Sequence, residues 1–363
     1  MADAPARALV IYGDAVLPAL TPHHTSIHAL AASGCCGFLA LRDLQPSVNG
    51  AHRVVAELAQ LLDVQDLYTI EAREEDCKFP SHQATEENAA SLCMPSMSDR
   101  FMGIKAAMLT NSSSAGALGK RAGFTVSLLE EIDGGKTSGC SKISKMLPDP
   151  AFLASKLLNL LNFGEATKEL QSEKETPKYE LLLLHVLAQE RRRSANMTSS
   201  LQTESKQVIS FNENLTVQLP TSIEVADWLD LLLANVKHLA TPGSSAAKHC
   251  YLVLVLGYGT AGCQDNLSEQ FPLLEGTKGL SPELLQLRPR QSYSMKGGQL
   301  VNGIRNSHPL LAVHQLESVT RCDLCGTFEF NEFQEKSGNL AILAGRFLHE
   351  IAFKLWKAPK YGA

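Results

Sequence analysis

Short runs of apolar residues alternate along the chain with segments in which apolar residues recur at helical spacing. The runs are rich in Val, Ile and Leu and have no polar side, which is typical of strands buried on both faces of a parallel sheet. They span residues 8–12, 36–41, 105–110, 124–129, 179–186, 251–256 and 309–314.

Apolar residues three and four positions apart predict amphipathic helices over 52–62, 151–163, 223–239 and 339–356. The clearest is 223–239, where Trp228, Leu232 and Val236 share a face, and where acidic residues early in the segment favour the helix dipole. Strands that alternate with helices predict an α/β fold, doubly wound, with a mostly parallel sheet and helices on both faces.

Three polar stretches interrupt this pattern, at 71–100, 189–213 and 264–305. They carry prolines, glycines, Ser/Thr/Gln-rich segments and, in the second, the cluster Arg191–Arg193 after Glu190. We expect them to be loop-like insertions in a single domain that spans 1–363.

Composition excludes some classes of function. The chain is 44% hydrophobic and 20% charged with a net charge of −5, so it is globular and has no general attraction to nucleic acid or anionic lipid. No apolar run is long enough to cross a membrane, and the N-terminus enters a strand-like run without a signal core. A cytoplasmic location is expected.

Nine cysteines, an odd number, are scattered through the chain as in cytosolic proteins. Cys322 and Cys325 form the one CxxC motif. A zinc site there would need a second pair of ligands, for which His308 and His314 are the close candidates. A turn with two free thiols is the interpretation we favour.

The carboxyl ends of parallel strands meet at one edge of a sheet, where ligands bind in such folds. The strand ends there offer one carboxylate, hydroxyls, a histidine and a glycine-rich turn, which suit a phosphorylated small molecule with or without a divalent metal. The candidates are Asp14, Ser112, Ser113, His185, Glu190, Gly257, Gly259 and Thr260.

Each candidate also has a structural interpretation. Asp14 can cap a turn, Ser112 can be the N-cap of the next helix, and a histidine in an apolar strand is often a hydrogen-bonded core residue. Residues 257–262 match G-x-G-x-x-G, but Pro272 interrupts the segment after them, so the helix that a dinucleotide site needs is missing.

The ordered segments resemble the archaeal-type, cofactor-independent phosphoglycerate mutases of the alkaline-phosphatase superfamily. The resemblance is carried by the motif LVIYGD at 9–14, by Thr21-Pro22, and by the segments 30–34, 102–110, 116–123, 179–188, 223–239, 330–333 and 338–345. It implies an alkaline-phosphatase-like core and a phosphoryl transfer that uses two metals and a serine nucleophile.

Transfer of that chemistry residue by residue is incomplete. The resemblance makes Asp14 a metal ligand, although the glycine expected after it is Ala15, and 71–100 holds no counterpart of the serine nucleophile. The family's Asp-His pair before Gly-Thr corresponds to Gly257-Tyr258. Its late His-Thr pair falls near Arg305 and Asn306, with His308 close by.

The residues that remain imply either no metal or a single divalent ion (Mn, Zn or Mg) on Asp14, His185 and Glu190. We therefore expect a divergent, non-catalytic protein that keeps a cleft for a phosphorylated ligand or serves a binding or regulatory role. One alternative is a working metal-dependent phosphomutase or phosphohydrolase with a rebuilt site. Another is an interaction protein that uses the Arg191–Arg193 cluster.

Overall fold

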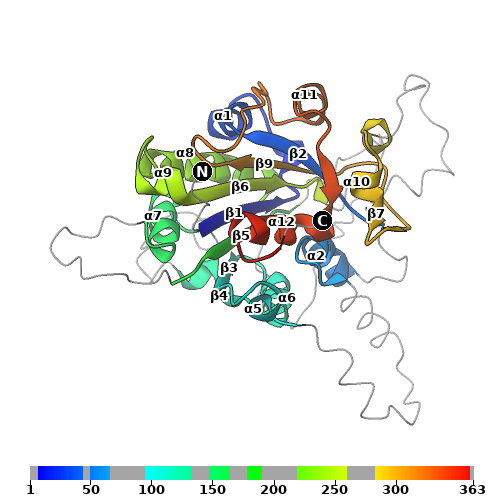
Figure 1. The fold of residues 1–363 in the computed structure, drawn as a ribbon. Coiled ribbons are helices and arrows are strands. Elements are labelled where there is room, and N and C mark those ends of the chain that lie inside the picture. The colour runs from blue at the N-terminus through cyan, green and yellow to red at the C-terminus, as the bar shows by residue number, and fades with distance from the viewer. Residues whose placement is uncertain are drawn as a thin grey trace, which may run out of the picture.

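A central eight-stranded sheet organises the computed structural model, which describes residues 7–43, 50–65, 95–132, 147–163, 178–189, 219–259 and 283–359. The strand order is β10-β2-β9-β6-β1-β5-β3-β4. The strands are β1 (Arg7–Asp14), β2 (Cys35–Ala40), β3 (Ala106–Thr110), β4 (Thr125–Leu128), β5 (Leu181–Leu187), β6 (Cys250–Leu256), β9 (Leu310–Gln315) and β10 (Ala341–Leu343). Figure 1 shows these strands in the middle of the molecule with helices on both sides.

The sheet is mostly parallel, as the alternation of apolar runs and helices predicts. β9 runs antiparallel to its neighbours β2 and β6, and every other pair in the sheet is parallel. Each predicted strand is present, with ends shifted by one or two residues. The α/β fold class is therefore confirmed, and β1 lies between β5 and β6 near the centre of the sheet.

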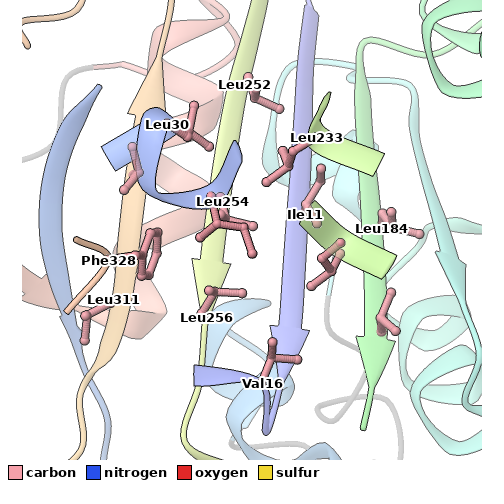
Figure 2. Close-up of a cluster of buried hydrophobic side chains, with 14 of the residues drawn as sticks. Ile11, Val16, Leu30, Leu184, Leu233, Leu252, Leu254, Leu256, Leu311 and Phe328 are labelled. Carbon is pink, nitrogen blue, oxygen red and sulfur yellow. The ribbon is translucent and has the colours of Figure 1, made fainter. Parts of the chain in front are cut away.

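One face of the sheet is covered by α1 (Thr25–Ser33), α7 (Pro150–Leu160) and α8 (Ser222–Leu239). In Figure 2, Ile11, Leu184 and Leu254 project from neighbouring strands into the same apolar cluster as Leu30 of α1 and Leu233 of α8. Burial of aliphatic side chains stabilises the fold by roughly 1.5–3 kcal/mol for each one taken fully out of water.

The other face is covered by α2 (Gly50–Leu61), α6 (Ser113–Arg121) and α12 (Phe347–Lys354), which share a second apolar cluster with strand residues Val10 and Val253. Successive residues of a strand point to opposite faces, so β1 and β6 feed both clusters. The remaining helices of the described residues are α5 (Met97–Arg100), α9 (Ser245–His249), α10 (Gln291–Ser294) and α11 (Phe330–Lys336), with 3₁₀ turns at Leu17–Ala19, Leu129–Glu131, Glu283–Gln286 and Ala344–Arg346.

The helix predicted over 339–356 is wrong in its first half. Ala341–Leu343 forms β10, which pairs with β2 in parallel, and the helix begins only at Phe347. Gly338 and Asn339 have positive φ angles of 68° and 57°, so the chain turns sharply just before the strand. An edge of the sheet that offers backbone partners overrides the helical spacing of these residues.

The predicted insertions are described in part. Residues 95–100 contain α5, and 283–305 contain short elements, including β7 (Met295–Lys296) paired with β8 (Gln299–Leu300). Residues 71–94, 190–213 and 264–282, with Arg191–Arg193 among them, lie outside the described residues. Across the described ranges, no helix combines the length and apolar character that a membrane crossing requires.

The cysteines of the sheet behave as small apolar residues, as their positions suggest. Cys36 and Cys250 are buried free thiols in β2 and β6. Of the CxxC pair, Cys322 is exposed and its thiol donates to the Ser33 carbonyl at 3.3 Å, whereas Cys325 is buried. Within the described residues, no group of three His, Cys, Asp or Glu side chains is arranged to hold a metal ion, at this motif or elsewhere.

Candidate functional site

Asp14 is the last residue of β1 and lies at the carboxyl edge of the sheet, where the sequence places it. The chain leaves the strand through Ala15, whose φ of 61° is in the left-handed region that glycine adopts without strain. A residue with a β-carbon held there costs of order 1–3 kcal/mol, and such strain clusters at functional sites. The backbone is therefore strained directly after Asp14.

His185 of β5 lies beside Asp14. Tyr12 and His185 are register partners, and the alternation of side chains along β1 turns Asp14 to the same face as Tyr12. The His185 Nε2 and Asp14 Oδ2 atoms are 3.8 Å apart, with side-chain exposures of 0% and 6%. This distance is too long for a hydrogen bond, and Nε2 has no hydrogen-bond partner within the described part of the chain.

Thr110 completes this group from the end of β3, on the other side of β5. Its Oγ1 is 2.8 Å from His185 Nδ1 and accepts a hydrogen bond from the Ser112 N–H at 3.1 Å. If the hydroxyl donates to Nδ1, the proton of the neutral ring is on Nε2 and faces the Asp14 carboxylate. If Nδ1 donates instead, Nε2 presents a lone pair to the same space.

A second buried group lies on the same face, over Tyr12. The Tyr12 hydroxyl donates to Glu57 Oε2 of α2 at 3.2 Å, and Arg305 Nη1 donates to Glu57 Oε1 at 2.9 Å. Burial raises the pKa of Glu57 to about 7, although the Arg305 guanidinium opposes this. Burial also raises the pKa of Tyr12, and the Asp14 and Glu57 carboxylates act in the same direction.

Glu57 is not among the site residues expected from the sequence, which at the end of β3 named Ser112 and Ser113. Glu57 lies between the buried residues Ala56 and Leu58 on α2. A charged residue among the apolar positions of a predicted helix is the sequence signal that could have indicated a buried polar group. Arg305 falls where the resemblance places the family's late His-Thr pair, and its side chain is buried against Glu57. We name the six side chains Asp14, His185, Thr110, Tyr12, Glu57 and Arg305 the carboxyl-edge cluster.

The expected hydroxyl and glycine ligands lie around this cluster. Ser112 is buried and is the N-cap of α6, since its hydroxyl accepts from the Ala115 N–H at 3.3 Å, while Ser113 is exposed. Gly257 packs against the cluster, because a β-carbon there would lie 3.1 Å from Glu57 Oε2 and 3.4 Å from the Tyr12 hydroxyl. Its N–H donates to the Gly13 carbonyl.

The glycine-rich turn after β6 then leaves this face. Tyr258 packs against the opposite apolar cluster, and its ring meets that of His308 edge-on at a centroid distance of 4.6 Å. Gly259 has a φ of 73°, and Thr260 lies outside the described residues. Tyr258 therefore supplies no ligand beside Asp14.

Two of the three side chains expected to hold a metal lie side by side in the structure. Asp14 and His185 converge and the unpartnered Nε2 fits a cation as its missing partner, but Glu190 lies outside the described residues. A carboxylate and an imidazole are donors that Zn²⁺ and Mn²⁺ accept. If an ion binds there, its charge would stabilise an anionic group of a ligand at this edge.

No protein-family model and no curated protein sequence matches the chain. Solved structures resemble its fold. The PH0037 protein of Pyrococcus horikoshii is 10% identical, with a TM-score of 0.47 over 99% of this chain and 100% of that one. The cofactor-independent phosphoglycerate mutase of Thermoplasma acidophilum is 9% identical, with a TM-score of 0.39 over 97% and 100%.

A protein of the alkaline phosphatase superfamily from Vibrio parahaemolyticus is 9% identical, with a TM-score of 0.38 over 88% of this chain and 62% of that one. At these identities and TM-scores the likenesses concern the path of the chain and carry no information on its chemistry. Some of the proteins that share this chain path are members of the alkaline phosphatase superfamily.

Proposed function

We propose that this chain is a divergent, phosphoglycerate-mutase-like binding protein that does not catalyse the mutase reaction. The observation that carries the proposal is the burial of the carboxyl-edge cluster. His185 is bonded to Thr110, Glu57 is bonded to Tyr12 and Arg305, and the Asp14 side chain is 6% exposed. Tyr12, Glu57 and Arg305 satisfy one another in the interior, so they stabilise the scaffold and are not free to work on a substrate.

The ligand we propose is a phosphorylated small molecule at the start of α6. The backbone N–H groups of the first turn point out of a helix, and the helix dipole favours an anion there. Ser112 occupies the Ala115 N–H, and the exposed Ser113 adds a hydroxyl beside the remaining donors. A cytoplasmic location, in keeping with nine scattered cysteines, belongs to the same proposal.

A second candidate function rests on a different observation. Asp14 and His185 lie 3.8 Å apart with Nε2 unpartnered among the described residues, which is an arrangement suited to a single divalent ion. With Glu190 as a third donor, such an ion would support a metal-dependent phosphomutase or phosphohydrolase with a rebuilt site.

Activity and metal content separate the two candidates. The purified full chain would be assayed for phosphoglycerate mutase and phosphatase turnover with added Mn²⁺, and its metal content would be measured. We expect no turnover above that of Asp14→Asn. Turnover that is lost in Asp14→Asn and kept in Asp43→Asn, an exposed aspartate, would replace the binding proposal by the enzyme.

Calorimetric titration with 3-phosphoglycerate and with inorganic phosphate tests the ligand. Ser113→Asp places a negative charge in the first turn of α6 and should weaken binding at least about tenfold. Ala117→Asp is the matched control, because this exposed residue lies in the middle of the same helix. Equal loss in both variants, or no binding by the unaltered chain, would exclude the phosphate site.

A further inference from the structure

A cavity of about 420 Å³ lies at the opposite edge of the sheet, where β6 begins and β9 ends. It is lined by α8, α9 and the start of β6, with Leu158 of α7 at one side. Leu252 and Gln315 are register partners at its base. Sites for small molecules usually have volumes of about 300–1,000 Å³, so the cavity is large enough to be one.

The lining of this cavity is mainly aliphatic. Val236 and Leu252 contribute branched side chains, and the short side chains of Ala240, Ala246 and Ala247 leave the space between α8 and α9 unfilled. An apolar cavity of about 150 Å³ in another protein is large enough to bind benzene. An apolar group of similar or larger size therefore suits this lining.

One cation reaches the cavity among the described lining residues. Lys237, in the last turn of α8, is half-buried, and its amine makes no hydrogen bond or ion pair with a described residue. Burial lowers the pKa of Lys237, while Asp230 acts in the opposite direction. A charged amine that has lost part of its hydration is stabilised by an anion brought next to it.

The other polar side chains of the lining have partners. Both carboxylate oxygens of Glu317 accept from the Gly243 N–H, at 3.1 and 3.0 Å, and the Gln315 amide donates to the Ser33 hydroxyl at 2.9 Å. Lys237 is thus the cationic group of the described lining that has no bonded partner and can pair with an anion.

We infer that this cavity binds a small amphipathic carboxylate, with its apolar body against Val236, Leu252 and the alanines and its carboxylate paired with Lys237. The site is separate from the carboxyl-edge cluster, and its occupation does not depend on the function proposed there. The class of ligand follows from the two features of the lining, an aliphatic wall and a single unpaired amine.

Titration calorimetry with octanoate, octanol and octylamine tests the inference, because these probes share one apolar chain and differ in the head group. We expect octanoate to bind the full chain more tightly than octanol, and octylamine to bind least. The inference fails if octanoate does not bind, or if octanol or octylamine binds as tightly as octanoate.

Three variants locate the site. Lys237→Met keeps the length of the side chain. It should weaken the binding of octanoate at least about tenfold, while the affinity for octanol should change less than about twofold. Ala247→Leu fills the cavity and should abolish binding of both probes, with thermal unfolding as the check that it folds. Lys248→Gln, an exposed lysine of α9 that does not line the cavity, should leave binding unchanged. Unchanged octanoate binding by Lys237→Met would overturn the assignment of the head group.

Discussion

Polar groups are buried differently at the two edges of the sheet. At the carboxyl edge, Glu57 is buried with partners on both carboxylate oxygens, and His185 is bonded through Nδ1. At the amino edge, the alanines of α8 and α9 leave a cavity of about 420 Å³, and the half-buried Lys237 faces it without a bonded partner among the described residues. Among the described residues, the carboxyl edge pairs most of its buried polar groups with one another, whereas the amino edge leaves a cavity beside an amine.

The difference bears on where ligands are sought in this fold. In open α/β sheets the carboxyl edge is the usual place, and the strand ends there carry Asp14 and His185. A binding site, however, requires unfilled volume together with unpaired polar groups. Among the described residues, the cavity at Lys237 has both features, whereas at Asp14 the unpartnered His185 Nε2 is fully buried.

The largest expected effect is a difference in the free energy of unfolding between a variant at the carboxyl edge and one at the amino edge. Glu57→Leu leaves the buried Arg305 without its carboxylate and should lower the free energy of unfolding by about 3–5 kcal/mol near pH 8. Lys237→Met removes an unpaired amine and should change the free energy of unfolding by less than about 1 kcal/mol. Urea unfolding of both variants measures this. Similar losses in the two would show that the edges do not differ in this way.

The next effect concerns pH. Since burial raises the pKa of Glu57 to about 7 from 4.5, the folded protein keeps a proton that the unfolded chain loses between these values. This contribution to stability is fully present below about pH 4.5 and is lost as the pH rises through about 7, by roughly 3 kcal/mol.

Urea unfolding at a series of pH values compares the unaltered chain with Glu57→Gln, in which this residue no longer titrates. We expect the unaltered chain to lose stability relative to this variant as the pH rises through the window, and the difference between them to be constant on either side. Parallel curves would mean that Glu57 keeps an ordinary pKa. Lys237→Met should follow the unaltered chain throughout this window, because it leaves Glu57 and its partners Tyr12 and Arg305 in place.

The smallest effect concerns the group next to Asp14. Thr110→Val removes the hydroxyl that joins His185 Nδ1 to the Ser112 N–H and should cost about 1–3 kcal/mol. Thr110→Ser keeps the hydroxyl and deletes one methyl group, so we expect a loss of about 1 kcal/mol. Thermal unfolding of the two variants shows which substitution costs more stability. Valine tolerated better than serine would show that the hydroxyl does not support this edge.

The fold follows in large part from the amino-acid sequence. Apolar runs such as 179–186 and 251–256 predict strands buried on both faces, and β5 and β6 are such strands. The helix at 223–239 is also present almost as predicted, as α8. Residues 341–343 were predicted as helix, because their spacing alone does not reveal that β2 offers them a strand partner.

For the candidate site, the sequence by itself placed Asp14 and His185 at strand ends along one edge of a sheet, because hydrophobic periodicity and the parallel-sheet rule depend on local pattern. Their separation of 3.8 Å, the approach of Glu57 and Arg305, and the cavity beside Lys237 were decided only by the tertiary structure. The physical reason is distance along the chain: Glu57 and Arg305 are 248 residues apart, and no local pattern encodes which buried charges will meet.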